Sequence, residues 1–179
     1  MTGFSFANKH SNSFRLAMEQ AHRPLLPAKL PNEYVISGRH GTIDFGNETY
    51  TTRQIIVDIC FIAGNTHDLQ TLSRDIALWL SGRGQLIFDD EPQKAYTAVV
   101  HESIDTIEFI RTKRASVIFT CQPFAKTVRP IQTEHINITL PQTITVINNG
   151  TQPTPIRIII KNTGISNING IKIIRRAEI

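Results

Sequence analysis

The sequence predicts a mainly β (α+β) protein: a β-sandwich-like N-terminal domain with one amphipathic helix, followed by a partial β-rich segment. Three observations lead to this prediction. Short runs of alternating apolar residues recur along most of the chain, which is typical of strands. Only one stretch has the periodicity of a helix. The composition changes after Lys126, where Thr, Asn, Ile and Pro dominate and no Phe, Tyr or Trp occurs.

The N-terminal stretch becomes rich in proline. Pro24, Pro27 and Pro31 stand within eight residues, and proline is unsuited to a helix interior or a central strand. We therefore expect Arg23–Asn32 to be extended. An ordinary long loop and a partner-binding arm remain equally open interpretations. A short strand is expected next, at Tyr34–Ile36.

A long strand is predicted from Tyr50 to Ala63, because apolar residues occupy both alternating sets of positions there. Between Ile55 and Ile62 the only charged residue is Asp58. Both faces of this strand should therefore be at least partly covered.

The single predicted helix runs from Asn65 to Ser81. Asn65 is a good N-cap and Asp68 stands in the position of a capping box. Apolar residues at helical spacing form one stripe, which we expect to pack against the sheet. Its members are Leu69, Leu72, Ile76, Trp79 and Leu80.

Further strands complete the predicted N-terminal domain, 1–126. Gln85–Phe88 and Ala95–Glu102 are separated by an acidic turn. Asp105–Ile110 and Ala115–Cys121 are expected to form a hairpin with Arg111–Arg114 at its tip.

The predicted C-terminal segment, 127–179, is basic and short. Residues 1–126 hold 13 Lys/Arg and 13 Asp/Glu, so the net charge of +4 comes from six basic and two acidic residues after Lys126. Turns are expected at Asn148–Gly150 and Asn162–Gly164. Four β-branched strands are expected around them, at Ile136–Leu140, Thr143–Ile147, Ile156–Ile160 and Ile171–Ile174.

Neither the cysteines nor the apolar runs suggest a redox or membrane function. Cys60 and Cys121 each lie in an apolar alternating run, which favours buried free thiols. A disulfide between them stays an open alternative, since it requires their strands to be neighbours. No apolar run is long enough to span a bilayer, and the N-terminus lacks the pattern of a signal peptide.

The search for catalytic, metal or cofactor sites yields one acidic cluster, Asp89–Glu91, followed by Pro92. Paired carboxylates can perform acid–base chemistry or bind a hard cation. A solvated turn is the favoured interpretation, because successive turn residues diverge and the six histidines are scattered singly. Basic residues do not alternate with aromatic ones, which argues against nucleic-acid binding. We therefore expect no enzyme activity, no cofactor and no metal.

Five stretches share their order and spacing with a known family: Gly38–Gly46, Arg53–Val57, Asp75–Gly82, Leu86–Pro92 and Val117–Phe124. Over residues 34–125 the chain resembles the distal tail proteins of siphoviruses, found in phages and prophages of Gram-positive bacteria. His40 is one departure, on a loop where relatives often carry an acid.

The resemblance implies a structural role at the tip of the virion tail, after assembly in the host cytoplasm. Such proteins form a hexameric ring between the major tail tube protein and the tail-associated lysin or fibre hub, and in many phages they dock receptor-binding proteins. DNA passes through the lumen without specific binding. The resemblance also makes the C-terminal segment the start of a galectin-like domain, although 53 residues are fewer than the roughly 100 of a full sandwich. We expect a shortened or reduced domain.

A ring of this kind brings different surfaces of each copy together. We expect the proline-rich segment, the outer side of the helix and the hairpin tip to contribute. Two other functions remain alternatives, namely a carbohydrate-binding module and a metal-dependent enzyme or nuclease that uses the acidic cluster. The candidate interface residues are Arg23, Leu25, Leu26, Leu30, Arg74, Arg111, Lys113 and Arg114.

Overall fold

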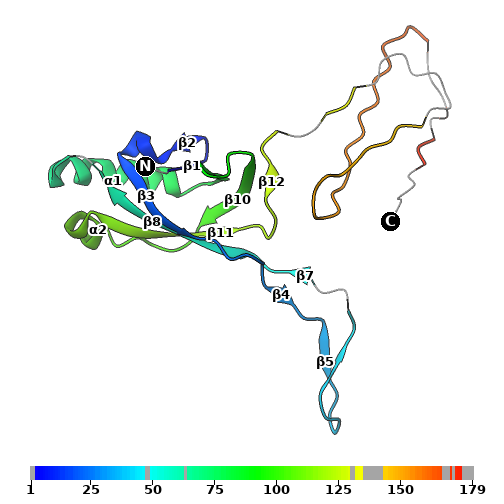
Figure 1. The fold of residues 1–179 in the computed structure, drawn as a ribbon, viewed down its shortest axis with the longest axis horizontal. Coiled ribbons are helices and arrows are strands. Elements are labelled where there is room, and N and C mark those ends of the chain that lie inside the picture. The colour runs from blue at the N-terminus through cyan, green and yellow to red at the C-terminus, as the bar shows by residue number, and fades with distance from the viewer. Residues whose placement is uncertain are drawn as a thin grey trace. The chain divides into compact units, whose positions relative to one another are not determined.

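The computed structural model describes residues 3–46, 49–62, 64–129, 132–134, 143–166, 170 and 172–174. The chain divides into two compact units, Met1–Gln132 and Thr133–Ile179. The elements of the first unit are labelled in Figure 1. They are β1 (Phe4–Phe6), β2 (Lys9–His10), the 3-10 helix η1 (Ser11–Phe14), β3 (Leu16–His22), β4 (Lys29–Leu30), β5 (Glu33–Val35), β6 (Thr42–Asp44), β7 (Thr49–Tyr50), β8 (Arg53–Phe61), α1 (Thr66–Leu80), β9 (Arg83–Phe88), β10 (Lys94–Val100), α2 (Thr106–Thr112), β11 (Arg114–Cys121) and β12 (Lys126–Thr127).

The main sheet has eight antiparallel strands in the order β2-β1-β9-β10-β11-β8-β3, and β12 pairs with β10. Two strands, β9 and β10, separate β1 from β11, a span of roughly 14 Å in a flat sheet. Yet the ring of Phe6 on β1 lies only 5.1 Å from that of Phe119 on β11. The sheet therefore curls over its own core. The predicted sandwich-like packing comes from one curled sheet instead of two separate sheets.

Aromatic residues fill the inside of the curl, and α1 covers it. Trp79 stacks on Phe14 at 4.6 Å and on Phe4 at 5.6 Å between ring centroids. Its indole N–H donates a buried hydrogen bond of 2.8 Å to the backbone carbonyl of Phe6. The predicted amphipathic helix is confirmed, with Asn65 as N-cap and a complete capping box to Asp68. No helix within the described residues is long and apolar enough to cross a bilayer.

The long predicted strand is confirmed as β8, and its two faces differ in exposure. Ile55, Val57, Ile59 and Phe61 are buried in the core, whereas the alternate side chains are mostly half-buried. β8 pairs with β11 over eight positions, from Arg53 to Cys60, and with β3 on its other side.

One predicted strand is wrong, because Asp105–Ile110 does not extend into a hairpin with β11. It forms most of a short second helix, α2, which is capped by the side chain of Asp105. The fold is mainly β, as predicted, but it has two α-helices within the described residues instead of one. The expected boundary after residue 126 also falls inside a paired region, since Lys126 and Thr127 form β12 and pair with Ala95 and Lys94.

The second unit has two turns but no strands in its described part. Thr143–Ile147 and Ile156–Ile160, predicted as strands, have no regular structure. The same holds for residues 172–174, while Ile136–Leu140 and Ile171 lie outside the described residues. The two predicted turns are confirmed: Asn148 accepts a hydrogen bond from the Gly150 amide, and Asn162 does the same for Gly164.

Candidate functional site

The three carboxylates of the acidic turn point to three different partners. Asp89 accepts hydrogen bonds from the backbone N–H of Gly3 at 2.7 Å and from His10 Nε2 at 3.1 Å. Glu91 pairs with Lys94 at 3.0 Å, and this carboxylate raises the pKa of the Lys94 ammonium. A divergent set of this kind cannot converge on one cation or one substrate atom.

Asp90, the middle carboxylate, holds Arg23 at the end of β3. The two side chains make a bidentate pair, with Arg23 Nη1 3.1 Å from Asp90 Oδ1. The hydrogen bonds from Arg23 lower the pKa of the Asp90 carboxyl and raise the pKa of the guanidinium. The guanidinium also lies 4.7 Å from the centre of the Phe88 ring. Arg23 was predicted at an interface, but in this unit it links β3 to the turn between β9 and β10.

The two thiols are free and lie at opposite ends of one ladder. Cys60 is opposite Arg114, and Cys121 is opposite Arg53. The ladder thus separates the two sulfur atoms, which settles the question of a disulfide. Burial raises the pKa of the Cys121 thiol to about 12. Burial also raises the pKa of the half-buried Cys60, helped by Glu19.

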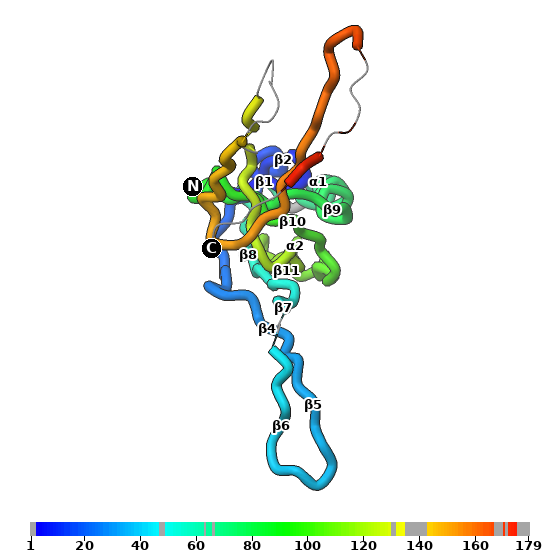
Figure 2. Tube along the Cα trace, turned by 90° about the vertical axis from the view of Figure 1, so that its right-hand side faces the viewer, coloured from blue at the N-terminus to red at the C-terminus, as the bar shows by residue number. Residues whose placement is uncertain are grey.

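Residues 24–52, named the β arm here, leave the sheet as a narrow two-stranded ribbon (Figure 2). The strands β4 and β7 pair near its root, and β5 and β6 pair further out. Between them, the Phe45 amide donates to the Asn32 carbonyl at 2.9 Å. At the outer end the chain reverses through Gly38 and Gly41, whose φ values of 82° and 83° favour glycine. The prediction of an extended segment in Arg23–Asn32 is confirmed.

The β arm carries apolar side chains that are exposed in the part of this unit that the structure describes. The predicted residues Leu25, Leu26 and Leu30 are all exposed, with Leu25 99% accessible. Tyr34, Val35 and Phe45 are exposed too, and sequence reasoning missed them. An alternating strand pattern does not reveal whether the strand packs against a core. Only the nearby proline and glycine residues indicated that this segment differs from the rest of the sheet. Several large apolar side chains exposed on one short segment indicate a site of interaction.

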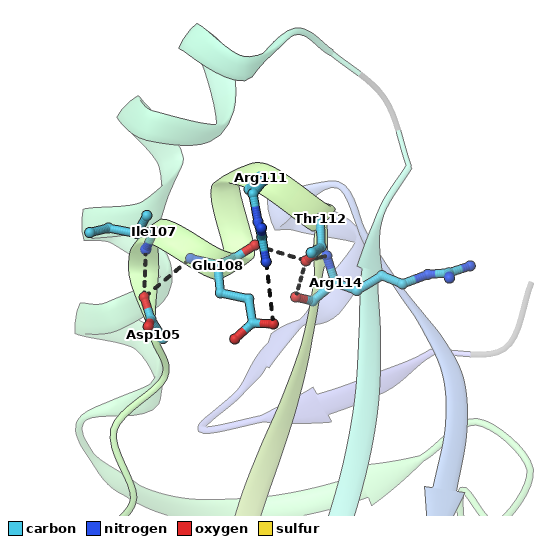
Figure 3. A network of polar contacts seen from close by, with 6 residues as sticks. All are labelled: Asp105, Ile107, Glu108, Arg111, Thr112 and Arg114. Carbon is cyan, nitrogen blue, oxygen red and sulfur yellow. Dashed lines mark hydrogen bonds and ion pairs between the residues drawn. The ribbon is translucent and has the colours of Figure 1, made fainter.

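The remaining predicted residues gather around the helices. Figure 3 shows α2 with its N-cap Asp105 and its last turn. Asp105 Oδ1 accepts from the amides of Ile107 and Glu108 at 2.8 and 3.1 Å. At the other end the Thr112 hydroxyl lies 2.8 Å from the Glu108 carbonyl and accepts from the Arg114 amide.

The predicted hairpin tip at Arg111–Arg114 is wrong. These residues form the last turn and C-cap of α2 and the first residue of β11. Lys113 is the C-cap, in the left-handed region at φ 58°. Arg114 pairs with Glu19 of β3 at 3.0 Å. Arg111 is 3.9 Å from Glu108, with both side chains exposed. Arg74 is exposed on α1, and within the described residues it makes no ion pair.

The eight predicted residues thus fall into two groups at opposite ends of β8. Arg23, Leu25, Leu26 and Leu30 belong to the end where β8 begins, at Arg53. Arg74, Arg111, Lys113 and Arg114 belong to the other end, since α1 follows Phe61 and α2 joins β11 opposite Cys60. β8 itself is nine residues long and spans roughly 26 Å between these two ends.

Comparison with known proteins shows which family the chain belongs to. The family described as phage tail protein RIFT-related domain matches residues 12–121. The chain belongs to this family. The match covers β3, the β arm, both helices and the sheet up to β11, and it confirms the expected resemblance to phage tail proteins.

A solved structure gives the same answer for the fold of this phage tail protein. The Dit protein of phage SPP1, described as a paradigm of the hub adsorption apparatus in phages that infect Gram-positive bacteria, aligns with a TM-score of 0.55. The identity is 15%, and the alignment covers 68% of this chain and 50% of that chain. The similarity therefore concerns the fold, and this chain spans about half of the SPP1 protein. No curated protein matches the chain.

Proposed function

We propose that this phage tail protein is a structural hub of the tail tip that assembles into a hexameric ring through its β arm. Family membership supports a place in the virion tail. The exposed apolar surface of the β arm is the single observation that carries the proposed assembly. A residue such as Leu25 gains on the order of 2 kcal/mol when it is fully buried, so several of them together favour association.

In the proposed tail tip, the ring joins the major tail tube protein to the tail-associated lysin or fibre hub and to receptor-binding proteins. The balanced charge of residues 1–126 suits a lumen through which DNA passes without being retained. The role is structural instead of catalytic, since the three acidic side chains are each held by a separate partner. The C-terminal segment, 127–179, contains no Phe, Tyr or Trp. It therefore offers no aromatic ring on which a sugar could stack, which argues against the carbohydrate-binding alternative.

Light scattering coupled to size-exclusion chromatography, followed by negative-stain microscopy, tests the assembly. We expect a ring of six copies, alone or on addition of the tail tube protein. A matched pair of variants identifies the β arm as the cause. Leu25→Ser with Leu26→Ser should weaken assembly, whereas Arg83→Ser with Gln85→Ser, at two exposed positions of β9 outside the β arm and both helices, should not. A chain that stays monomeric at high concentration beside its tube partner contradicts the proposal.

A further inference from the structure

Two acidic residues face each other on the β arm. Glu33 of β5 and Asp44 of β6 are directly opposite in the antiparallel register, and like charges in this position are unfavourable. Within the described residues neither makes an ion pair, although Asp44 accepts a hydrogen bond from the Gly46 amide at 2.7 Å. Val35 lies two residues along from Glu33, so it projects from the same face of the ribbon and is exposed.

The helical end of the molecule presents the complementary pattern. Arg74 and Leu78 are one turn apart on α1, and Ile107 and Arg111 are one turn apart on α2, so each helix displays one aliphatic and one basic side chain on a single face. Leu78 is 75% exposed and Ile107 is 81% exposed. Arg111 has only the loose contact with Glu108 described above. α2 packs against α1, so the two helices lie side by side.

These two surfaces cannot meet within one copy, because they lie at opposite ends of β8. A contact between the arm of one copy and the helices of another is therefore heterologous, with different surfaces meeting. Repeated contacts of that kind close into a ring when the rotation between copies permits. In such a contact the acidic pair of the β arm and the two arginine-bearing helix faces are complementary in charge.

We propose that the β arm of one copy lies on the α1–α2 surface of a second copy, with Glu33 and Asp44 facing Arg74 and Arg111. Val35 covers the aliphatic side chains next to the two arginines. The contact rests on the proposed function, since it specifies the surface that receives the β arm in the ring. It also gives each member of the like-charged pair a partner of opposite charge.

Charge reversal with rescue tests the contact. The arm variant carries Glu33→Lys and Asp44→Lys, and the helix variant carries Arg74→Glu and Arg111→Glu. Like charges placed against each other across an interface weaken it strongly, so each variant alone should assemble at least about 100-fold more weakly than the wild type. Mixed in equal amounts, the two variants should assemble again, because every arm then meets a helix surface of opposite charge.

Native mass spectrometry of the mixture should show alternating oligomers with an even number of copies. Arg83→Glu with Lys126→Glu, two exposed positions outside both surfaces, is the matched control and should assemble like the wild type. Thermal melts of all variants separate loss of assembly from loss of folding.

Three results would overturn the contact. If the charge-reversed variants assemble like the wild type, the proposed ion pairs do not form. If the two variants are folded but do not assemble when mixed, the β arm and the helix surface belong to different contacts. In both cases the wild type still forms its ring, so the proposed function stands. A wild-type chain that never assembles would overturn the proposed function and the contact together.

Discussion

Trp79 is the residue through which α1 is fixed to the sheet. Its ring contacts three phenylalanines, and its indole N–H satisfies the carbonyl of Phe6. One side chain thus combines apolar burial with a specific hydrogen bond, and a buried carbonyl left without a donor is costly.

We expect Trp79→Phe to lower the free energy of unfolding by about 1–3 kcal/mol, because the Phe6 carbonyl loses its donor. Trp79→Ala should cost about 3–5 kcal/mol, since it also leaves a cavity. Urea unfolding followed by circular dichroism measures both. Leu78→Ala, one position earlier and exposed, is the control and should change stability by less than about 0.5 kcal/mol. A loss below about 0.5 kcal/mol for Trp79→Phe would contradict a role for the hydrogen bond.

Cys121 makes stability depend on pH in the alkaline range. Its thiol has a pKa of about 12 in the folded chain against an ordinary value of 9.0, so between these values the folded state keeps a proton that the unfolded state releases. The free energy of unfolding is therefore unaffected by this thiol below pH 9. Above pH 9 it falls by up to about 1.4 kcal/mol per pH unit, because the unfolded state is stabilised by losing the proton.

Cys121→Ala should therefore flatten the loss of stability between pH 9 and 11, measured by urea unfolding under reducing conditions. The comparison is between slopes, so the cost of the smaller side chain at neutral pH does not affect it. Identical slopes for the variant and the wild type would show that Cys121 ionises equally in both states.

Among the elements, α2 shows where local patterns mislead. Residues 105–110 contain alternating apolar positions, which favour a strand, but Asp105 followed by Glu108 is equally the start of a helix. Tertiary packing decides between them, because a helix of seven residues has little stability of its own. Only Phe109 of this helix is buried, against the core.

Asp105→Ala should destabilise the protein by about 1 kcal/mol, because the amides of Ile107 and Glu108 lose their acceptor. Asp105→Asn retains a capping oxygen and should be nearly neutral. Thermal unfolding of both variants provides the measurement, and hydrogen exchange at residues 107–109 localises the effect. An equal loss in both variants would point to the charge of Asp105 instead of its cap.

Elements with strong local signals were predictable, and those that depend on distant partners were not. Asn65, Asp68 and the apolar stripe specify α1 locally, and the alternation around Ile59 specifies β8. By contrast, β1 pairs locally only with the two-residue β2, and all three of its residues pair with β9, 80 to 84 residues further along the chain. In the candidate site, the proline signals located the β arm, but no sequence pattern showed that Tyr34 and Phe45 are exposed.

The whole molecule consists of one unit with a large core and one without regular strands in its described part. The first unit ends beyond β12, since Lys126 and Thr127 pair with β10 and the Val128 amide donates to the Gln93 carbonyl. The buried residues of the core cluster all lie between Phe4 and Cys121, within the first unit.

A chain that ends at Gln132 should therefore unfold with the same free energy as the full chain, within about 0.5 kcal/mol. A chain that ends at Ala125 loses the hydrogen bonds of β12 and should be less stable by about 1–3 kcal/mol. Urea unfolding of the three lengths gives the comparison. A clear loss already at Gln132 would show that residues 133–179 stabilise the first unit.

The way the β arm joins the sheet also determines how the molecule would respond to mechanical force. The arm continues directly from β3 and β8 (Figure 1), so tension on its tip runs along β8. The ladder between β8 and β11 spans eight residue pairs, and such a pull would load its hydrogen bonds in shear, all at once instead of one after another. The Arg23–Asp90 pair clamps β3 at the same point. Pulling on the β arm would accordingly meet the resistance of the whole β8–β11 ladder at once.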